Sequence, residues 1–95
     1  MYYLAVPSDR AQDIANLGYY CRYRRFVPLS YTVSDARAAF ARNYPGRPAT
    51  VFAVVSLPSW ARVRAMGPGL TLSSNFLPRA HLVRLPNAVG GYTAG

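Results

Sequence analysis

The sequence contains neither lysine nor glutamate, although 11 basic and 3 acidic residues occur among its 95. Every basic residue is an arginine and every acidic residue is an aspartate, which gives a formal net charge of +8. A Schiff-base lysine, a lysine-dependent P-loop and a glutamate general acid are therefore excluded. Any function must rest on arginine, hydroxyl, aromatic and backbone groups.

Cysteine and histidine are equally scarce, since each occurs once, as Cys21 and His81. A single cysteine excludes an internal disulfide framework. With so few ligand side chains we expect neither a metal site nor a Cys–His nucleophile pair. We expect His81 to be structural, and Trp60 to be a core residue or an anchor for a partner.

Long apolar runs are absent, because no segment reaches the 18 or so residues of a membrane span. The N-terminus lacks the basic region of a signal peptide. We therefore expect a cytoplasmic protein without a membrane partner. The length fits one domain over residues 1–86, and the glycine-rich residues 87–95 are expected to form a flexible tail.

The charge is the main functional signal. A pI near 10.4 predicts attraction to polyanions such as nucleic acid, nucleotide phosphates or an acidic protein surface. The exclusive use of arginine has two compatible explanations. One is coding bias in a GC-rich genome, and the other is bidentate recognition of phosphate by guanidinium groups.

Apolar periodicity and turn residues predict an α+β fold with a small split sheet and two main helices. The helices are expected to begin at Ser8 and Ser34 as N-caps, and the first to end at Gly18. Strands are expected over residues 1–6, 26–31, 50–57, 70–72 and 81–85, with a short helical turn over residues 58–63 and a polar turn over 73–75.

Three groups of residues are candidates for binding. Arg22, Arg24 and Arg25 lie among aromatic residues, so they either contact phosphates beside stacking rings or form a solvated face. Ser30, Tyr31 and Thr32 follow a strand, where their hydroxyls either hold a ribose or phosphate or serve as turn and capping groups. Arg42 and Arg47 flank a turn, and are either two exposed charges or the two sides of one anion site.

The order of short motifs along residues 1–85 is similar to that of a known family. The motifs are residues 2–5 followed by Ile14 and Gly18, Val27-Pro28-Leu29-Ser30, Arg42 with Gly46-Arg47-Pro48, the apolar residues 51–54, Ser73-Ser74-Asn75 and residues 78–82. Together they resemble the NAD-binding lobe of the RNA 2′-phosphotransferases, which have the ADP-ribosyltransferase fold and transfer a 2′-phosphate from RNA to NAD.

The resemblance implies a role for individual residues. Tyr3, Ser30, Tyr31 and Thr32 would bind NAD, with Tyr3 and Arg42 acting in catalysis. Of the family's catalytic arginines, Arg42 alone has a positional match. The arginines Arg22, Arg24, Arg25 and Arg47 are expected to hold phosphate or nucleic acid because of their own chemistry. Tyr3 and Pro28 stand where the family has histidines, and the glutamate of other ADP-ribosyltransferases is missing.

Two functions from different classes follow. The first is an NAD-dependent transferase acting on a phosphate-bearing or nucleic-acid acceptor. The second is a catalytically inactive binding protein of the same fold, such as a phage or accessory factor, that engages RNA, another polyanion or an acidic protein. Convergence of Tyr3, Ser30, Tyr31 and Arg42 on one cleft would favour the first.

Overall fold

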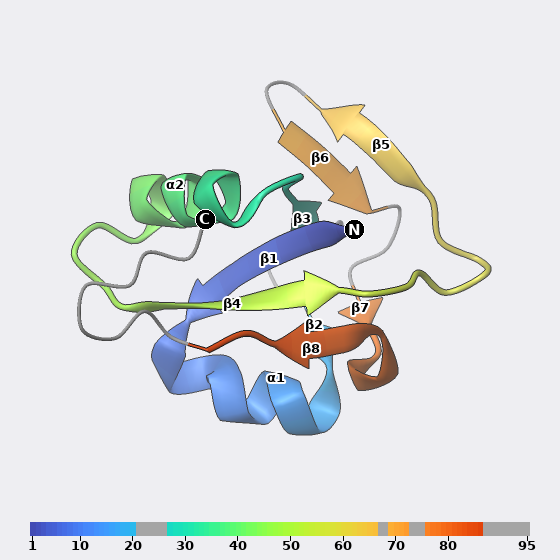
Figure 1. Ribbon diagram of the computed structural model, residues 1–95, viewed down its shortest axis with the longest axis horizontal. Helices are drawn as coiled ribbons and strands as arrows, with labels where there is room; N and C mark the ends of the chain where they lie inside the picture. The colour runs from blue at the N-terminus through green and yellow to red at the C-terminus, as the bar shows by residue number, and fades with distance from the viewer. Residues whose placement is uncertain (21–26, 67–68, 73–75, 87–95) are drawn as a thin grey trace.

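A computed structural model describes residues 1–20, 27–66, 69–72 and 76–86 (Figure 1). The candidates Cys21, Arg22, Arg24 and Arg25, the predicted turn at 73–75 and the predicted tail at 87–95 lie outside these residues. The elements in chain order are β1 (Tyr2–Pro7), the 3₁₀ helix η1 (Ser8–Arg10), α1 (Ala11–Leu17), β2 (Tyr19–Tyr20), β3 (Pro28–Leu29), α2 (Val33–Asn43), β4 (Ala49–Val54), β5 (Val63–Met66), β6 (Gly69–Leu72), β7 (Phe76–Leu77), the 3₁₀ helix η2 (Arg79–His81) and β8 (Leu82–Arg84).

The predicted α+β fold with two main helices and a split sheet is confirmed. The described strands form three small sheets, ordered β1-β4-β8, β2-β7 and β3-β6-β5, and all their pairings are antiparallel. A single bridge between Tyr3 and Ser30 connects the first sheet to the third. No helix among the described residues is both long and apolar enough to cross a membrane.

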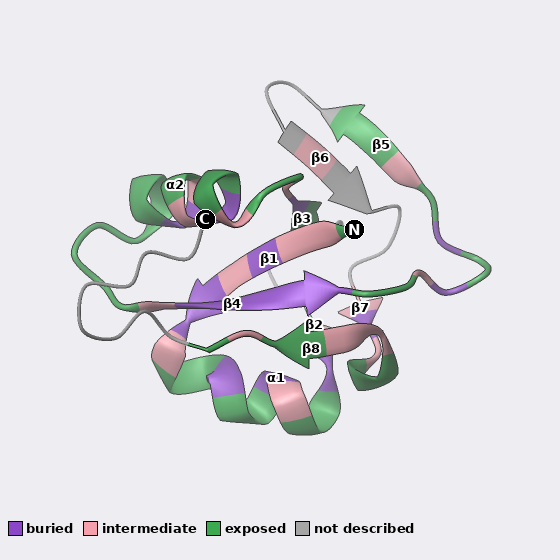
Figure 2. Ribbon diagram, in the orientation of Figure 1, coloured by how far each residue is buried: buried purple, intermediate pink, exposed green. Residues whose placement is uncertain are grey.

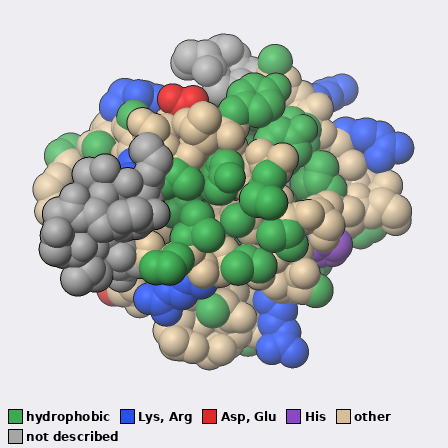
Figure 3. Space-filling model, viewed as in Figure 1, with side chains coloured by type: hydrophobic (Ala, Val, Ile, Leu, Met, Phe, Trp, Pro, Cys, Tyr) green, Lys and Arg blue, Asp and Glu red, His purple; other side chains and the backbone are tan. Residues whose placement is uncertain are grey.

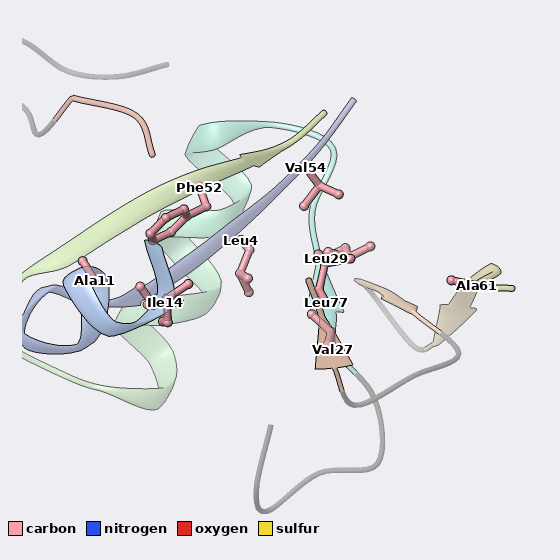
Figure 4. Close-up of a cluster of buried hydrophobic side chains, with 10 residues drawn as sticks. Leu4, Ala11, Ile14, Val27, Leu29, Phe52, Val54, Ala61 and Leu77 are labelled. Atoms are coloured by element: carbon pink, nitrogen blue, oxygen red, sulfur yellow. The ribbon is translucent and has the colours of Figure 1, made fainter. Parts of the chain in front are cut away.

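The central sheet buries both of its faces because a helix covers each one. Side chains alternate between the faces along a strand, so Leu4 and Phe52, which are direct partners, pack with Ile14 of α1 in the main core. Figure 4 shows Leu4, Ile14 and Phe52 in this core. Helix α2 packs on β1 and β4 from the other side, where Phe40 is buried. Strand β4 is buried along almost its entire length (Figure 2). Removing the buried Phe52 side chain would cost about 3–5 kcal/mol.

The N-caps predicted for the two helices are wrong. The hydroxyl of Ser8 forms a hydrogen bond with that of the buried Thr50, at 2.9 Å, and Ser8 begins η1 instead of capping α1. Helix α2 begins earlier than predicted, because Thr32 caps it: the backbone N–H of Asp35 donates to Thr32 Oγ1 at 3.0 Å. Thr32 satisfies a donor that the first helical turn would otherwise leave unpaired.

One predicted helical turn and one predicted strand need correction. The predicted short helix over 58–63 is wrong: these residues form a turn that leads into β5, and β5 pairs with β6. The predicted strand over 26–31 is shorter in the structure, with β3 over Pro28–Leu29 and a bridge at Ser30. Short strands are specified by their cross-strand partners, which a local pattern does not reveal.

Gly18 ends α1, as predicted, and its backbone conformation requires glycine. Its φ is 89° and its ψ is 173°, a region that is essentially restricted to glycine. A Cβ at this position would lie 2.7 Å from the carbonyl oxygen of Leu77 and 3.2 Å from Cε1 of Phe76. The absence of a side chain thus lets the end of α1 approach β7 closely.

Candidate functional site

Tyr3 and Ser30 lie side by side where β1 meets the end of β3. The N–H of Tyr3 donates to the carbonyl of Ser30 at 2.8 Å, and the N–H of Ser30 donates back to the carbonyl of Tyr3 at 2.9 Å. Directly opposed residues of an antiparallel pair project to the same face. The bridge therefore places the side chains of Tyr3 and Ser30 on one face of the sheet, and both residues are partly exposed.

Tyr31 lies on the other face of the same edge. Its ring is 5.9 Å from that of Tyr2, tilted by 39°, and Tyr2 packs against the main core. Because adjacent side chains of β1 alternate, Tyr2 and Tyr3 project in opposite directions. The predicted cofactor-binding residues are thus divided between two faces, with Thr32 acting as the cap of α2.

Arg42 lies far from these residues. It is an exposed residue in the last turn of α2, whereas Thr32 caps the first turn. Ten residues of helix separate the two positions, which corresponds to about 15 Å. The structure therefore does not bring Arg42 together with Tyr3, Ser30 and Tyr31 in one cleft.

Arg47 takes part in contacts within the chain. Its Nη2 lies 3.1 Å from Oδ2 of Asp9, with both side chains largely exposed. Its guanidinium carbon also lies 5.6 Å from the centre of the Tyr44 ring, which stacks on the buried Phe40 at 4.8 Å. An exposed ion pair of this kind contributes little to stability, so a phosphate can compete with Asp9 for the guanidinium group.

His81 has a hydroxyl partner. Its Nδ1 lies 2.7 Å from Oγ of Ser56, and its carbonyl accepts a hydrogen bond from the N–H of Val55. A serine beside a histidine is the starting point of a nucleophile–base pair. However, the ring has no carboxylate partner among the described residues to orient it. These bonds join the end of β4 to the start of β8, which agrees with a structural role.

The described surface carries both exposed arginines and exposed aromatic rings. Trp60 is 58% exposed and Tyr31 is 64% exposed. Arg62, two residues after Trp60, donates from Nη1 to the carbonyls of Ser59 and Ala61. Figure 3 shows hydrophobic side chains gathered in the middle of one face and arginine side chains around its edge. The exposed arginines in the described part of the chain are Arg10, Arg42, Arg47, Arg62, Arg64, Arg79 and Arg84.

Sequence reasoning missed a groove beside α1. It has a volume of about 480 Å³ and is lined by Arg10, Asp13, Ile14, Leu17, Gly18, Tyr20 and Phe76. The helical spacing of its first four residues was visible in the sequence. The pairing of Tyr20 with Phe76 joins residues far apart in the chain, and no local signal indicated it.

Neither metal chemistry nor similarity to known proteins narrows the function. Among the described residues there is no group of three or more His, Cys, Asp or Glu side chains that could hold a metal ion. Comparisons with protein-family models, curated protein sequences and solved structures give no match. The functional argument therefore rests on the residues themselves.

Proposed function

We propose that this chain binds single-stranded nucleic acid. The observation that carries the proposal is the imbalance of exposed charge: the described part of the chain has seven exposed arginines against the three exposed aspartates Asp9, Asp13 and Asp35. Guanidinium groups bind phosphates through paired N–H donors. Contacts of this kind dominate the affinity of proteins for nucleic acids.

The exposed rings favour nucleic acid over an acidic protein. Trp60, Tyr31, Tyr20 and Tyr44 are each at least 41% exposed. An acidic peptide needs only cations, whereas unpaired bases stack on aromatic side chains. Arginines beside exposed rings therefore match a single strand, whose bases are available for stacking.

An NAD-dependent transferase is the second candidate, favoured by one observation. The Tyr3 phenol and the Ser30 hydroxyl share a face at the β1–β3 bridge, as the resemblance to RNA 2′-phosphotransferases requires. The position of Arg42 at the far end of α2 weakens this candidate. We therefore favour nucleic-acid binding over NAD-dependent transfer as the function of this chain.

The test is fluorescence anisotropy with a labelled single-stranded oligouridylate, using Trp60→Ala and Trp60→Phe. Trp60 is largely exposed, so Trp60→Ala should leave the fold intact. If a base stacks on Trp60, its loss should cost about 1–3 kcal/mol, a factor of about 5 to 150 in Kd, and Trp60→Phe should retain most of the affinity.

Val83→Ala is the control, because Val83 is an exposed side chain on β8 that carries neither an aromatic ring nor a charge. Equal weakening by Val83→Ala and Trp60→Ala would contradict base stacking on Trp60. Displacement of the oligonucleotide by polyglutamate at equal charge concentration would instead favour an acidic protein partner. Displacement by NAD at low concentration would favour the transferase.

A further inference from the structure

The groove beside α1 has one helical wall that carries both signs of charge. Arg10, Asp13 and Leu17 are spaced so that they follow one side of η1 and α1, and all three are exposed, Leu17 at 73%. Ile14 lies on the same side and is fully buried at the base. The wall thus offers a cation, an anion and an apolar surface within two helical turns.

The opposite wall is aromatic. Tyr20 of β2 and Phe76 of β7 are direct partners in an antiparallel pair, so their rings project to the same side of the two strands. Tyr20 is 50% exposed and Phe76 is partly exposed. Gly18 lets this wall lie close to α1, since a Cβ at this position would be only 3.2 Å from Cε1 of Phe76.

The two charged groups in the groove, on Arg10 and Asp13, are exposed. Neither Arg10 nor Asp13 has an ion-pair or side-chain hydrogen-bond partner among the described residues. A guanidinium group is suited to a phosphate, and a carboxylate accepts hydrogen bonds from N–H donors. The rings of Tyr20 and Phe76 supply a surface for a planar heterocycle.

We propose that this groove holds one guanine nucleotide, with the base against Tyr20 and Phe76 and the phosphate on Arg10. Guanine presents two adjacent N–H donors, at N1 and N2, to a single carboxylate, which here is Asp13. Uracil presents one such N–H, and adenine and cytosine each present one amino group. A volume of about 480 Å³ is within the range of small-molecule sites.

The inference rests on the proposed binding of single-stranded nucleic acid and adds the base that is read. It is tested with four labelled oligouridylates whose central nucleotide is guanosine, adenosine, cytidine or uridine. The chain with its native residues should bind the guanosine oligonucleotide about fivefold more tightly than the other three, or better, because a bidentate contact discriminates by at least that factor.

Asp13→Asn gives a result that general loss of structure would not produce. The amide retains one acceptor and adds a donor, so the guanosine preference should disappear. Removal of a negative charge should at the same time slightly strengthen binding of the other three oligonucleotides. Asp35→Asn makes the same charge change in the first turn of α2, and should strengthen binding of all four while the preference remains.

The outcomes separate this inference from the proposed function. Equal, salt-sensitive affinity for all four oligonucleotides would overturn the guanine site and leave nucleic-acid binding standing. No measurable binding of any oligonucleotide would contradict the proposed function itself.

Titration of guanosine monophosphate alone shows whether the groove takes a free nucleotide or only a guanosine within a strand. Saturable binding of the monophosphate that Asp13→Asn abolishes would support a site for the free nucleotide. If neither the monophosphate nor the guanosine oligonucleotide binds, the guanine site is overturned.

Discussion

Two glycines with positive φ differ in what surrounds them. Gly18, at φ 89°, has three backbone or ring atoms within 3.2 Å of the position a Cβ would take, whereas Gly46, at φ 76°, has no atom within 4 Å. Both positions impose conformational strain on an alanine. At Gly18 alone the new methyl group would also collide with the carbonyl oxygen of Leu77.

We expect Gly18→Ala to lower the free energy of unfolding by about 3 kcal/mol or more, since strain and collision add. Gly46→Ala should cost only about 1 kcal/mol, from strain alone. Urea denaturation followed by tryptophan fluorescence measures both. Equal losses for the two variants would mean that the close approach of Gly18 to β7 is not present in solution.

Substitutions at Thr32 and Ser34 test which residue is the N-cap of α2. The hydroxyl of Thr32 accepts from the N–H of Asp35, whereas the exposed Ser34 lies inside the helix. Loss of an N-cap hydroxyl typically costs about 1 kcal/mol. Thr32→Ala should therefore destabilise the protein by about that amount, and Ser34→Ala should have an effect near zero, because alanine favours a helix. Thermal unfolding measures both variants. A larger loss of stability for Ser34→Ala than for Thr32→Ala would identify Ser34 as the N-cap.

The sequence predicted those elements whose signal is local. Helix α1 ends at Gly18, and the apolar run at 50–57 contains most of β4, because periodicity and glycine act over a few residues. Strands β2 and β7 were not predicted, since each has two residues and exists through pairing with the other. The segment 58–63 was taken for a helical turn because nothing near it reveals the pairing of β5 with β6.

The candidate site was predictable only in part for the same reason. Tyr3 and Ser30 were expected together, and a backbone bridge brings them together. The side of the sheet on which Tyr31 lies, and the separation of Arg42 along α2, depend on strand register and helix length in three dimensions. The groove escaped notice because Asp13 and Phe76 become neighbours only when β7 pairs with β2.

At the scale of the whole molecule, charge is the property that sequence and structure both emphasise. The absence of lysine makes arginine the sole basic side chain, and the described arginines are distributed over η1, α2, the two turns that flank β4, β5, η2 and β8, and most of them are exposed. Such a surface is suited to the long backbone of a polymer, which meets several arginines at once. The rings beside it then contact the bases.

The salt dependence of RNA binding tests this account most directly. Kd for a labelled single-stranded RNA should be measured over a series of salt concentrations at constant pH. Each phosphate contact contributes about 0.7 to the slope of log affinity against log salt for single strands. Three or more arginines in contact should therefore give a slope of about −2 or steeper. Affinity that does not change with salt, or no binding at the lowest salt, would contradict the account.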